Sequence, residues 1–125
     1  MNRMRYVLIF IILIILIGCS TDDITEEDLI GGEWVVTAGY KDGKPEGEPN
    51  CTPSVNPGLE FKDEETVYSK GYERDFNYSL EERKEGNSIY LEGIVHRIYY
   101  IEKISEDEFG LKGTYNDESC YFKRQ

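Results

Sequence analysis

Short runs in which apolar and polar residues alternate, each bounded by turn residues, constrain the fold of this chain most. The clearest run covers residues 74–83, where Phe76, Tyr78 and Leu80 alternate with polar side chains. A two-residue period places alternate side chains on opposite faces of a β-strand, so this run predicts a half-buried strand. After residue 31, no segment shows apolar residues at helical spacing over three turns. We therefore expect a domain built almost entirely of strands.

The same patterns predict eight strands, nearly all joined by turns of two to five residues. The strands cover residues 33–40, 58–62, 66–71, 74–83, 88–92, 94–104, 108–115 and 119–124. Residues 41–57 form the one long connection, and four prolines there indicate that no regular strand pairing occurs. Short connections favour an antiparallel meander, and eight strands can close it into an up-and-down β-barrel. An open sandwich is the alternative.

A short helical turn is expected just before the first strand. Thr25 followed by Asp28 fits a capping box, and Gly31-Gly32 would end the helix. A chain of 125 residues has room for one domain of modest core. Its 10 tyrosines and 12 glycines also favour strands and turns over helices.

The N-terminus has the layout of a secretory signal peptide. Arg3 and Arg5 lie in the first six residues without an acid, and residues 7–17 are uniformly apolar. This run is shorter than the roughly 20 residues that a membrane-spanning helix needs. An uncleaved N-terminal anchor is the alternative interpretation.

The residues Leu16-Ile17-Gly18-Cys19 resemble the lipobox of bacterial lipoproteins, in which a small residue precedes an invariant cysteine. The resemblance implies that residues 1–18 are removed and that Cys19 becomes the acylated first residue. Because each buried acyl methylene contributes about 0.8 kcal/mol, several chains on Cys19 would hold the protein on a membrane. Loss of Arg3 and Arg5, without loss of an acid, would change the net charge from −11 to −13.

Residues 19–27 are interpreted as an acidic tether that leads into a domain at residues 28–125. The run of Asp22, Asp23, Glu26 and Glu27 is similar to a signal that exports some Gram-negative lipoproteins to the cell surface. A solvated tether without signal function is the alternative. Ser20 directly after the cysteine is compatible with outer-membrane sorting. We therefore expect a lipid-anchored outer-membrane protein that faces either the periplasm or the outside.

If Cys19 is acylated, Cys51 and Cys120 remain as an even pair in an oxidising compartment, where disulfides form. A closed meander supports this pairing, because its first and last strands are neighbours. Cys51 lies in the connection that leaves the first strand, and Cys120 lies in the last strand. Two free thiols are the alternative.

Gly32-Glu33-Trp34 resembles the Gly-x-Trp opening of lipocalins and of small bacterial lipocalin-like lipoproteins, and Arg124 is similar to the arginine of their closing strand. The likeness covers roughly residues 28–124. It implies a barrel whose base is closed by Arg124 lying over Trp34 in a cation–π contact. It also implies binding of a small hydrophobic or amphipathic ligand, which is an argument from fold analogy.

The residues do not predict an enzyme. His96 is the only histidine and is interpreted as an ordinary strand residue, because no nucleophile motif accompanies it. Adjacent acids such as Glu81 and Glu82 point to opposite faces of a strand and cannot act together. The acids and the histidine also lack metal-ligand spacing. We expect no catalytic residue, no metal and no other cofactor.

Aromatic side chains are the candidates for a ligand site near the barrel mouth: Tyr68, Tyr72, Phe76, Tyr78, Tyr100 and Tyr115. Tyrosine combines an apolar ring with a polar end, which suits a wet pocket. The alternative is that most of these side chains fill the barrel. An interior cavity of roughly 300 Å³ or more would favour a small ligand.

A filled barrel would instead favour a surface-interaction or adhesion lipoprotein. Its loops, above all residues 41–57, would then contact a macromolecule or a glycan. A net charge of −11 argues against nucleic acid, because phosphate contacts need clustered Lys and Arg. We expect a monomer in either case.

Overall fold

A computed structural model describes residues 23–93 and 96–125 of the chain. The predicted signal peptide, the lipobox with Cys19, and residues 94–95 of the sixth predicted strand lie outside the described residues. The described part is all-β apart from one short helical turn, as the alternating pattern predicts.

The helix α2 (Glu26–Leu29) begins with a complete capping box, in which Thr25 and Asp28 each accept a backbone N–H from the other. The backbone N–H of Asp28 donates to Thr25 Oγ1 at 3.3 Å, and the Thr25 N–H donates back to Asp28 Oδ2 at 2.9 Å. Gly31 and Gly32 follow with φ angles of 101° and 80°, which end the helix. The packed part of the chain begins before position 28, since Ile24 is already buried.

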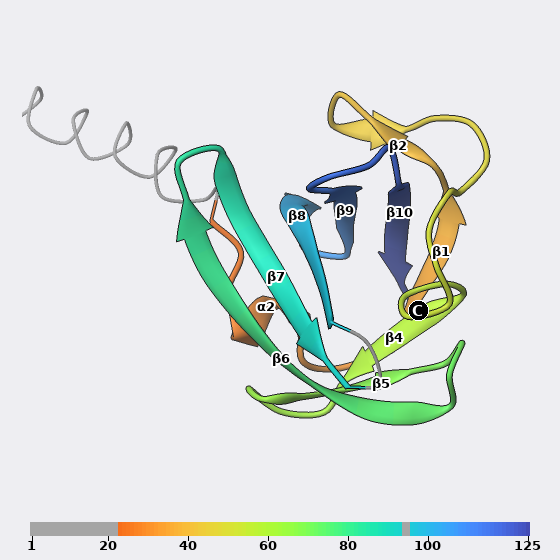
Figure 1. Cartoon of the computed structure of the whole chain (residues 1–125). Helices are drawn as coiled ribbons and strands as arrows, with labels where there is room; N and C mark the ends of the chain where they lie inside the picture. The colour runs from red at the N-terminus through yellow and green to blue at the C-terminus, as the bar shows by residue number, and fades with distance from the viewer. Residues whose placement is uncertain (1–22, 94–95) are drawn as a thin grey trace, which may run out of the picture.

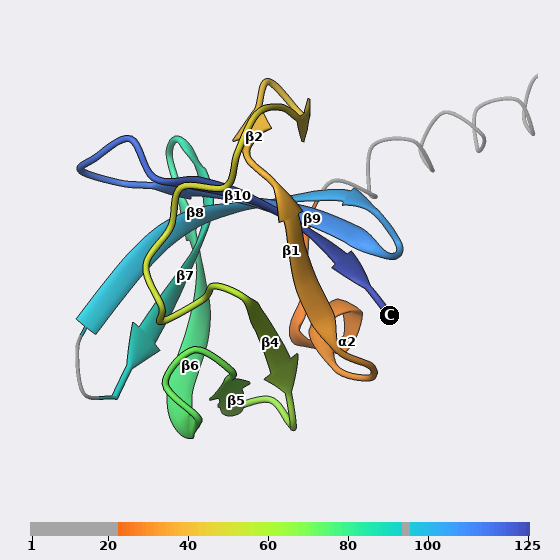
Figure 2. The ribbon, with the colours of Figure 1, turned by 90° about the vertical axis from the view of Figure 1, so that its right-hand side faces the viewer.

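Eight antiparallel strands close into one barrel. They are β1 (Trp34–Ala38), β4 (Gly58–Phe61), β5 (Thr66–Ser69), β6 (Arg74–Arg83), β7 (Gly86–Glu92), β8 (His96–Ser105), β9 (Glu108–Gly113) and β10 (Ser119–Arg124). Each pairs with its neighbour in the chain, and β1 pairs with both β4 and β10, which closes the ring. The closed barrel confirms the predicted meander and excludes the sandwich (Figures 1 and 2).

The long connection contains a hairpin that the sequence did not predict. Strands β2 (Tyr40–Lys41) and β3 (Lys44–Pro45) pair with each other and project past the end of β1 (Figures 1 and 2). Asp42 and Gly43 both have positive φ angles, 51° and 81°, which suits a two-residue hairpin turn. The expectation of no regular pairing is wrong here, because a proline at the outer end of a two-residue strand removes no needed donor.

The barrel interior is filled with apolar side chains. Aromatic rings pack in contact along it: Trp34 lies 4.7 Å from Phe109, and Phe109 lies 4.7 Å from Phe122, centroid to centroid. The remaining interior side chains with under 3% exposure include Leu59, Phe61, Val67, Phe76, Ile89, Leu91, Tyr99, Ile101 and Leu111. Together with Trp34, Phe109 and Phe122 they come from all eight barrel strands, so one continuous core holds the barrel together.

The base of the barrel is the end where β1 begins and β10 ends, and α2 lies beside it (Figure 2). The guanidinium carbon of Arg124 lies 4.3 Å from the centroid of the Trp34 ring, as the family resemblance implies. The Trp34 indole N–H donates to the Leu29 carbonyl at 2.9 Å, which ties α2 to the barrel. Leu29 is fully buried there. Side chains therefore close this end.

Candidate functional site

The mouth of the barrel, opposite the base, is covered by residues 50–57, which we call the mouth segment. Its backbone pairs with β10, because Asn50 and Ser119 exchange N–H···O bonds of 3.0 and 2.8 Å. Farther along, the Pro53 carbonyl accepts a bond of 3.2 Å from Ser69 Oγ at the end of β5. Val55 is fully buried in the core. The segment thus crosses the mouth and does not project as a free loop.

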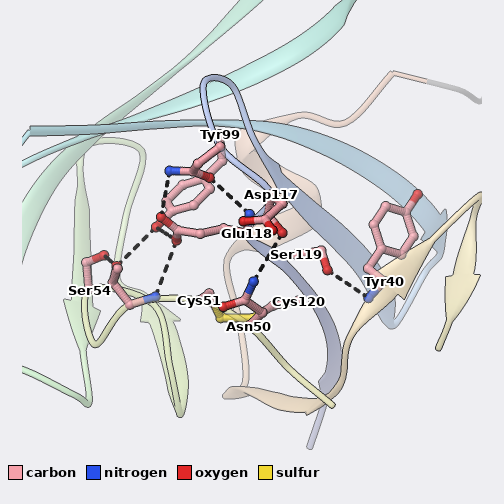
Figure 3. The surroundings of a disulfide bond; sticks show 11 residues. Tyr40, Asn50, Cys51, Ser54, Tyr99, Asp117, Glu118, Ser119 and Cys120 are labelled. Carbon is pink, nitrogen blue, oxygen red and sulfur yellow. Dashed lines mark hydrogen bonds between the residues drawn. A yellow bond between two sulfur atoms is a disulfide. The ribbon is translucent and has the colours of Figure 1, made fainter. Parts of the chain in front are cut away.

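A disulfide between Cys51 and Cys120 fastens the mouth segment to the start of β10 (Figure 3). The two Cα atoms are 6.2 Å apart, and Cys120 is fully buried. The predicted pairing is confirmed. Its reason is the predicted one, since barrel closure brings the connection that leaves β1 next to the last strand.

A hydrogen-bond network beside the disulfide joins the mouth segment to β8 and to the β9–β10 turn (Figure 3). Glu118 Oε1 accepts from the Thr52 N–H at 3.3 Å and from the Tyr99 hydroxyl at 3.0 Å. Its Oε2 accepts from Asn116 Nδ2 at 3.0 Å. Burial raises the pKa of Tyr99, which favours the neutral hydroxyl that donates to Glu118. These groups satisfy one another and hold the mouth closed.

The structure distributes the six predicted ligand-site residues over the core and the outside of the barrel. Phe76 and Tyr78 are buried in the core, and the Tyr78 hydroxyl donates to the Asp63 carbonyl at 2.7 Å, near the base. Tyr68 lies on the outer face of β5, where Lys62 Nζ is 5.5 Å from its ring centroid.

Of the other three, only Tyr72 contacts another candidate. Tyr72 packs on Phe76 with 5.8 Å between ring centroids. Tyr100 alternates with the buried Tyr99 and Ile101 and therefore lies on the outside of β8. Tyr115 follows the end of β9 and is 88% exposed. Strand alternation alone cannot distinguish the inside of a barrel from its outside, which is why the sequence did not separate these two groups.

The mouth end also carries a small pocket at its rim, with a volume of about 180 Å³. It lies where β8 extends past β9: the register of these strands begins at Tyr99 and Gly113, so residues 96–98 have no β9 partner. Figure 2 shows the start of β8 diverging from the β9–β10 turn. Among the lining residues are Arg97, Ile98 and Tyr115.

His96 and Tyr90 form one wall of this rim pocket. Their rings are stacked with 5.9 Å between centroids and an interplanar angle of 13°. The Tyr90 hydroxyl and His96 Nδ1 lie 2.7 Å apart in a hydrogen bond. His96 thus takes part in an aromatic pair at the rim.

Arg97 lines the rim pocket but is not among the site residues that the sequence predicts. Its position in β8 has the same parity as the buried Tyr99 and Ile101, and it stands opposite the buried Leu91. An arginine on the same strand face as two buried apolar residues could have indicated a site, because a charge that is buried needs a partner. In the structure, Arg97 Nε is buried without a hydrogen-bond partner.

Comparisons with known proteins identify no relative of this chain, so a function can be argued only from its sequence and structure. No family model, no curated protein and no solved structure matches the chain. Among residues 23–93 and 96–125, no helix has the length and apolar character needed to cross a bilayer. Within the same ranges, no three His, Cys, Asp or Glu side chains gather as metal ligands would.

Proposed function

We propose that this chain is a lipid-anchored outer-membrane protein that binds, without catalysis, through the outside of a closed barrel. Acylation of Cys19 supplies the anchor, and the Cys51–Cys120 disulfide agrees with an oxidising compartment outside the cytoplasm. The partner class is a surface macromolecule or a glycan.

The filled barrel is the observation that carries this proposal. Apolar side chains pack the interior, Arg124 and Trp34 close the base, and the mouth segment crosses the other end. A small hydrophobic ligand inside the barrel would have to displace these side chains. The rim pocket, with a volume of about 180 Å³, is below the size expected of an interior ligand site.

The position of the anchor orients the domain. Asp23 lies at the end of the barrel that holds the tip of the β6–β7 hairpin, since Asn87 Nδ2 donates to Asp23 Oδ1 at 3.4 Å. Four residue steps separate Asp23 from Cys19, a reach of at most about 14 Å. An anchor on Cys19 therefore keeps the base close to the membrane and turns the mouth end outward.

The base, which the anchor holds near the membrane, is acidic. The β4–β5 and β8–β9 turns both lie at this end and carry exposed acids: Asp63, Glu64, Glu65, Glu106 and Asp107. Anionic headgroups would repel such turns, so in this proposal the covalent anchor on Cys19, and not charge, holds the base near the membrane. The mouth end then remains free for contacts.

The anchor is tested by metabolic labelling with radioactive palmitate. We expect the wild-type chain to incorporate label and to sediment with outer membranes, whereas Cys19→Ser does neither. The double variant Cys51→Ser/Cys120→Ser is the matched control and should label like wild type, because it keeps Cys19. Proteinase treatment of intact cells then distinguishes the outer surface from the periplasm. Labelling of Cys19→Ser, or its absence in wild type, would overturn the proposal.

A further inference from the structure

The Arg97 side chain is half-buried, and its Nε is fully buried. No hydrogen bond or ion pair joins it to any other described residue, and its Nε has no partner although it is buried. A guanidinium is always charged and offers five N–H donors. In a chain with 25 acids, an arginine without a carboxylate partner is unexpected. Because Arg97 also lines the rim pocket, its outer N–H groups can meet an acceptor that enters there.

The rim pocket gives such an acceptor a place. Its volume of about 180 Å³ exceeds the roughly 150 Å³ in which an engineered cavity holds benzene, so it accommodates one six-membered ring. The stacked Tyr90 and His96 rings offer an aromatic wall, and Tyr115 lines the pocket from the β9–β10 turn. Rings of this kind pack well on a flat aromatic ring or on the apolar face of a sugar.

The acid beside Arg97 is already engaged. Glu118 also lines the pocket, but its two oxygens accept bonds from Thr52, Tyr99 and Asn116. The pocket therefore presents one cation with free donors next to aromatic surfaces, and a carboxylate is the acceptor whose two oxygens match a guanidinium.

We propose that the rim pocket binds a carboxylate carried on a six-membered ring, with Arg97 on the carboxylate and Tyr90, His96 and Tyr115 around the ring. Two sources share this chemistry: a free aromatic acid and a uronic acid residue of a glycan. The second source deepens the proposed function and rests on its orientation, in which the mouth end faces away from the membrane.

The test measures binding by calorimetry to the full chain, purified from membranes into lipid nanodiscs. Two matched pairs of probes are compared: benzoate with benzyl alcohol, and glucuronate with glucose. A charge-assisted pair predicts that each acid binds at least about tenfold more tightly than its neutral partner. Preference for benzoate indicates a free aromatic acid, and preference for glucuronate indicates a glycan. Equal binding of acid and neutral probe, or no binding at millimolar concentration, overturns the proposal.

Variants locate the site. Arg97→Met should lower the affinity for the acid at least about tenfold, whereas Arg83→Met, at the far end of the β6–β7 hairpin, should leave it unchanged. Tyr115→Ala should weaken binding several-fold with an unchanged melting temperature, because this side chain is 88% exposed. Retained binding in Arg97→Met contradicts the proposal.

Hydrogen exchange of the wild-type chain keeps the test decisive even if Arg97→Met fails to fold. The acid should protect peptides that cover residues 96–99 and 113–118, and protection elsewhere contradicts the site. Failure of palmitate labelling at Cys19 would remove the proposed function but leave this binding intact. Failure of acid binding would leave the anchor intact.

Discussion

Arg124 shows how one side chain closes the base. Besides lying over Trp34, it donates to Asp107 Oδ1 at 3.0 Å and to the carbonyls of Asp28, Ile30, Gly31 and Glu106 at 2.6–3.3 Å. These five contacts match the five N–H groups of a guanidinium. Lysine has three donors and no plane to stack, so the two residues are not equivalent here.

We expect Arg124→Lys to lower the free energy of unfolding by about 2–3 kcal/mol, because it loses hydrogen bonds to carbonyls that stay in place. Urea denaturation monitored by Trp34 fluorescence measures this. The adjacent Lys123→Ala is the control, and it should change stability by under about 0.5 kcal/mol since its side chain is 55% exposed. Equal losses of unfolding free energy in the two variants would show that the Arg124 hydrogen bonds do not stabilise the base.

Asp28, at the base of the barrel, makes the stability of the fold depend on pH. Burial raises the pKa of its carboxyl, but hydrogen bonds from Thr25 and from the Lys103 ammonium outweigh burial and hold the pKa below its ordinary 3.8. The folded state therefore favours the carboxylate. Its stabilising contribution is present above the unfolded pKa and is lost as pH falls through the lower, folded pKa.

Asp28→Asn should destabilise the protein by about 1 kcal/mol at pH 7, through the weakened cap and the lost ion pair. As pH falls below 4, the wild-type carboxyl takes up its proton and the difference between the two proteins should shrink. Urea unfolding at pH 7 and pH 3 measures both. A difference that stays constant or grows toward pH 3 contradicts the assignment.

At the level of elements, the disulfide and the mouth segment act as one unit. The bridged cysteines are separated by 69 residues, and constraint of the unfolded chain by a loop of this length stabilises the fold by at most about 4 kcal/mol. The segment is otherwise held by hydrogen bonds at its ends and by Val55 in the core.

Cys51→Ala/Cys120→Ala should lower the free energy of unfolding by about 2–4 kcal/mol. Hydrogen exchange should accelerate most in residues 50–57 and least in the long β6–β7 hairpin, whose pairing does not involve the mouth segment. Uniform acceleration across the barrel would show that the bridge does not hold this segment in particular.

The β2–β3 hairpin is a second element, and Tyr40 packs it against the barrel wall. Tyr40 is buried on the outside of the barrel, where its ring covers Gly110 of β9, and its hydroxyl donates to Glu102. A Cβ at position 110 would overlap the Tyr40 ring. Glycine is therefore required here by close packing.

Gly110→Ala should cost about 1–3 kcal/mol of stability, because the added methyl displaces the Tyr40 ring. In a Tyr40→Ala background the same substitution should cost clearly less, since the space is then open. Denaturation of the four proteins forms a double-mutant cycle that isolates this contact. Additive effects would contradict it.

For the whole molecule, the packed interior predicts that the folded protein carries no apolar ligand in its barrel. Native mass spectrometry of the purified protein should give the mass of the covalent chain alone, with no apolar molecule bound to it. A copurified fatty acid or other apolar molecule bound in the barrel would contradict the packed interior, and would favour a small-ligand carrier.

Local sequence determined the elements and their closure. Alternation at residues 74–83 predicts β6, turn residues separate eight short strands, and eight antiparallel strands close a barrel without exposed edges. Closure in turn brings β1 beside β10, which explains why Cys51 meets Cys120 and Arg124 meets Trp34. These features could be predicted because they follow from short-range patterns and from strand order.

Only the tertiary structure decided what fills and surrounds the barrel. The mouth segment folds across the opening, the six aromatic candidates divide between core and outer surface, and Arg97 lies at the rim where β8 outruns β9. Each of these depends on strand register and on contacts between distant parts of the chain. A two-residue period defines two faces of a strand, but closure of the sheet decides which of the two faces the core.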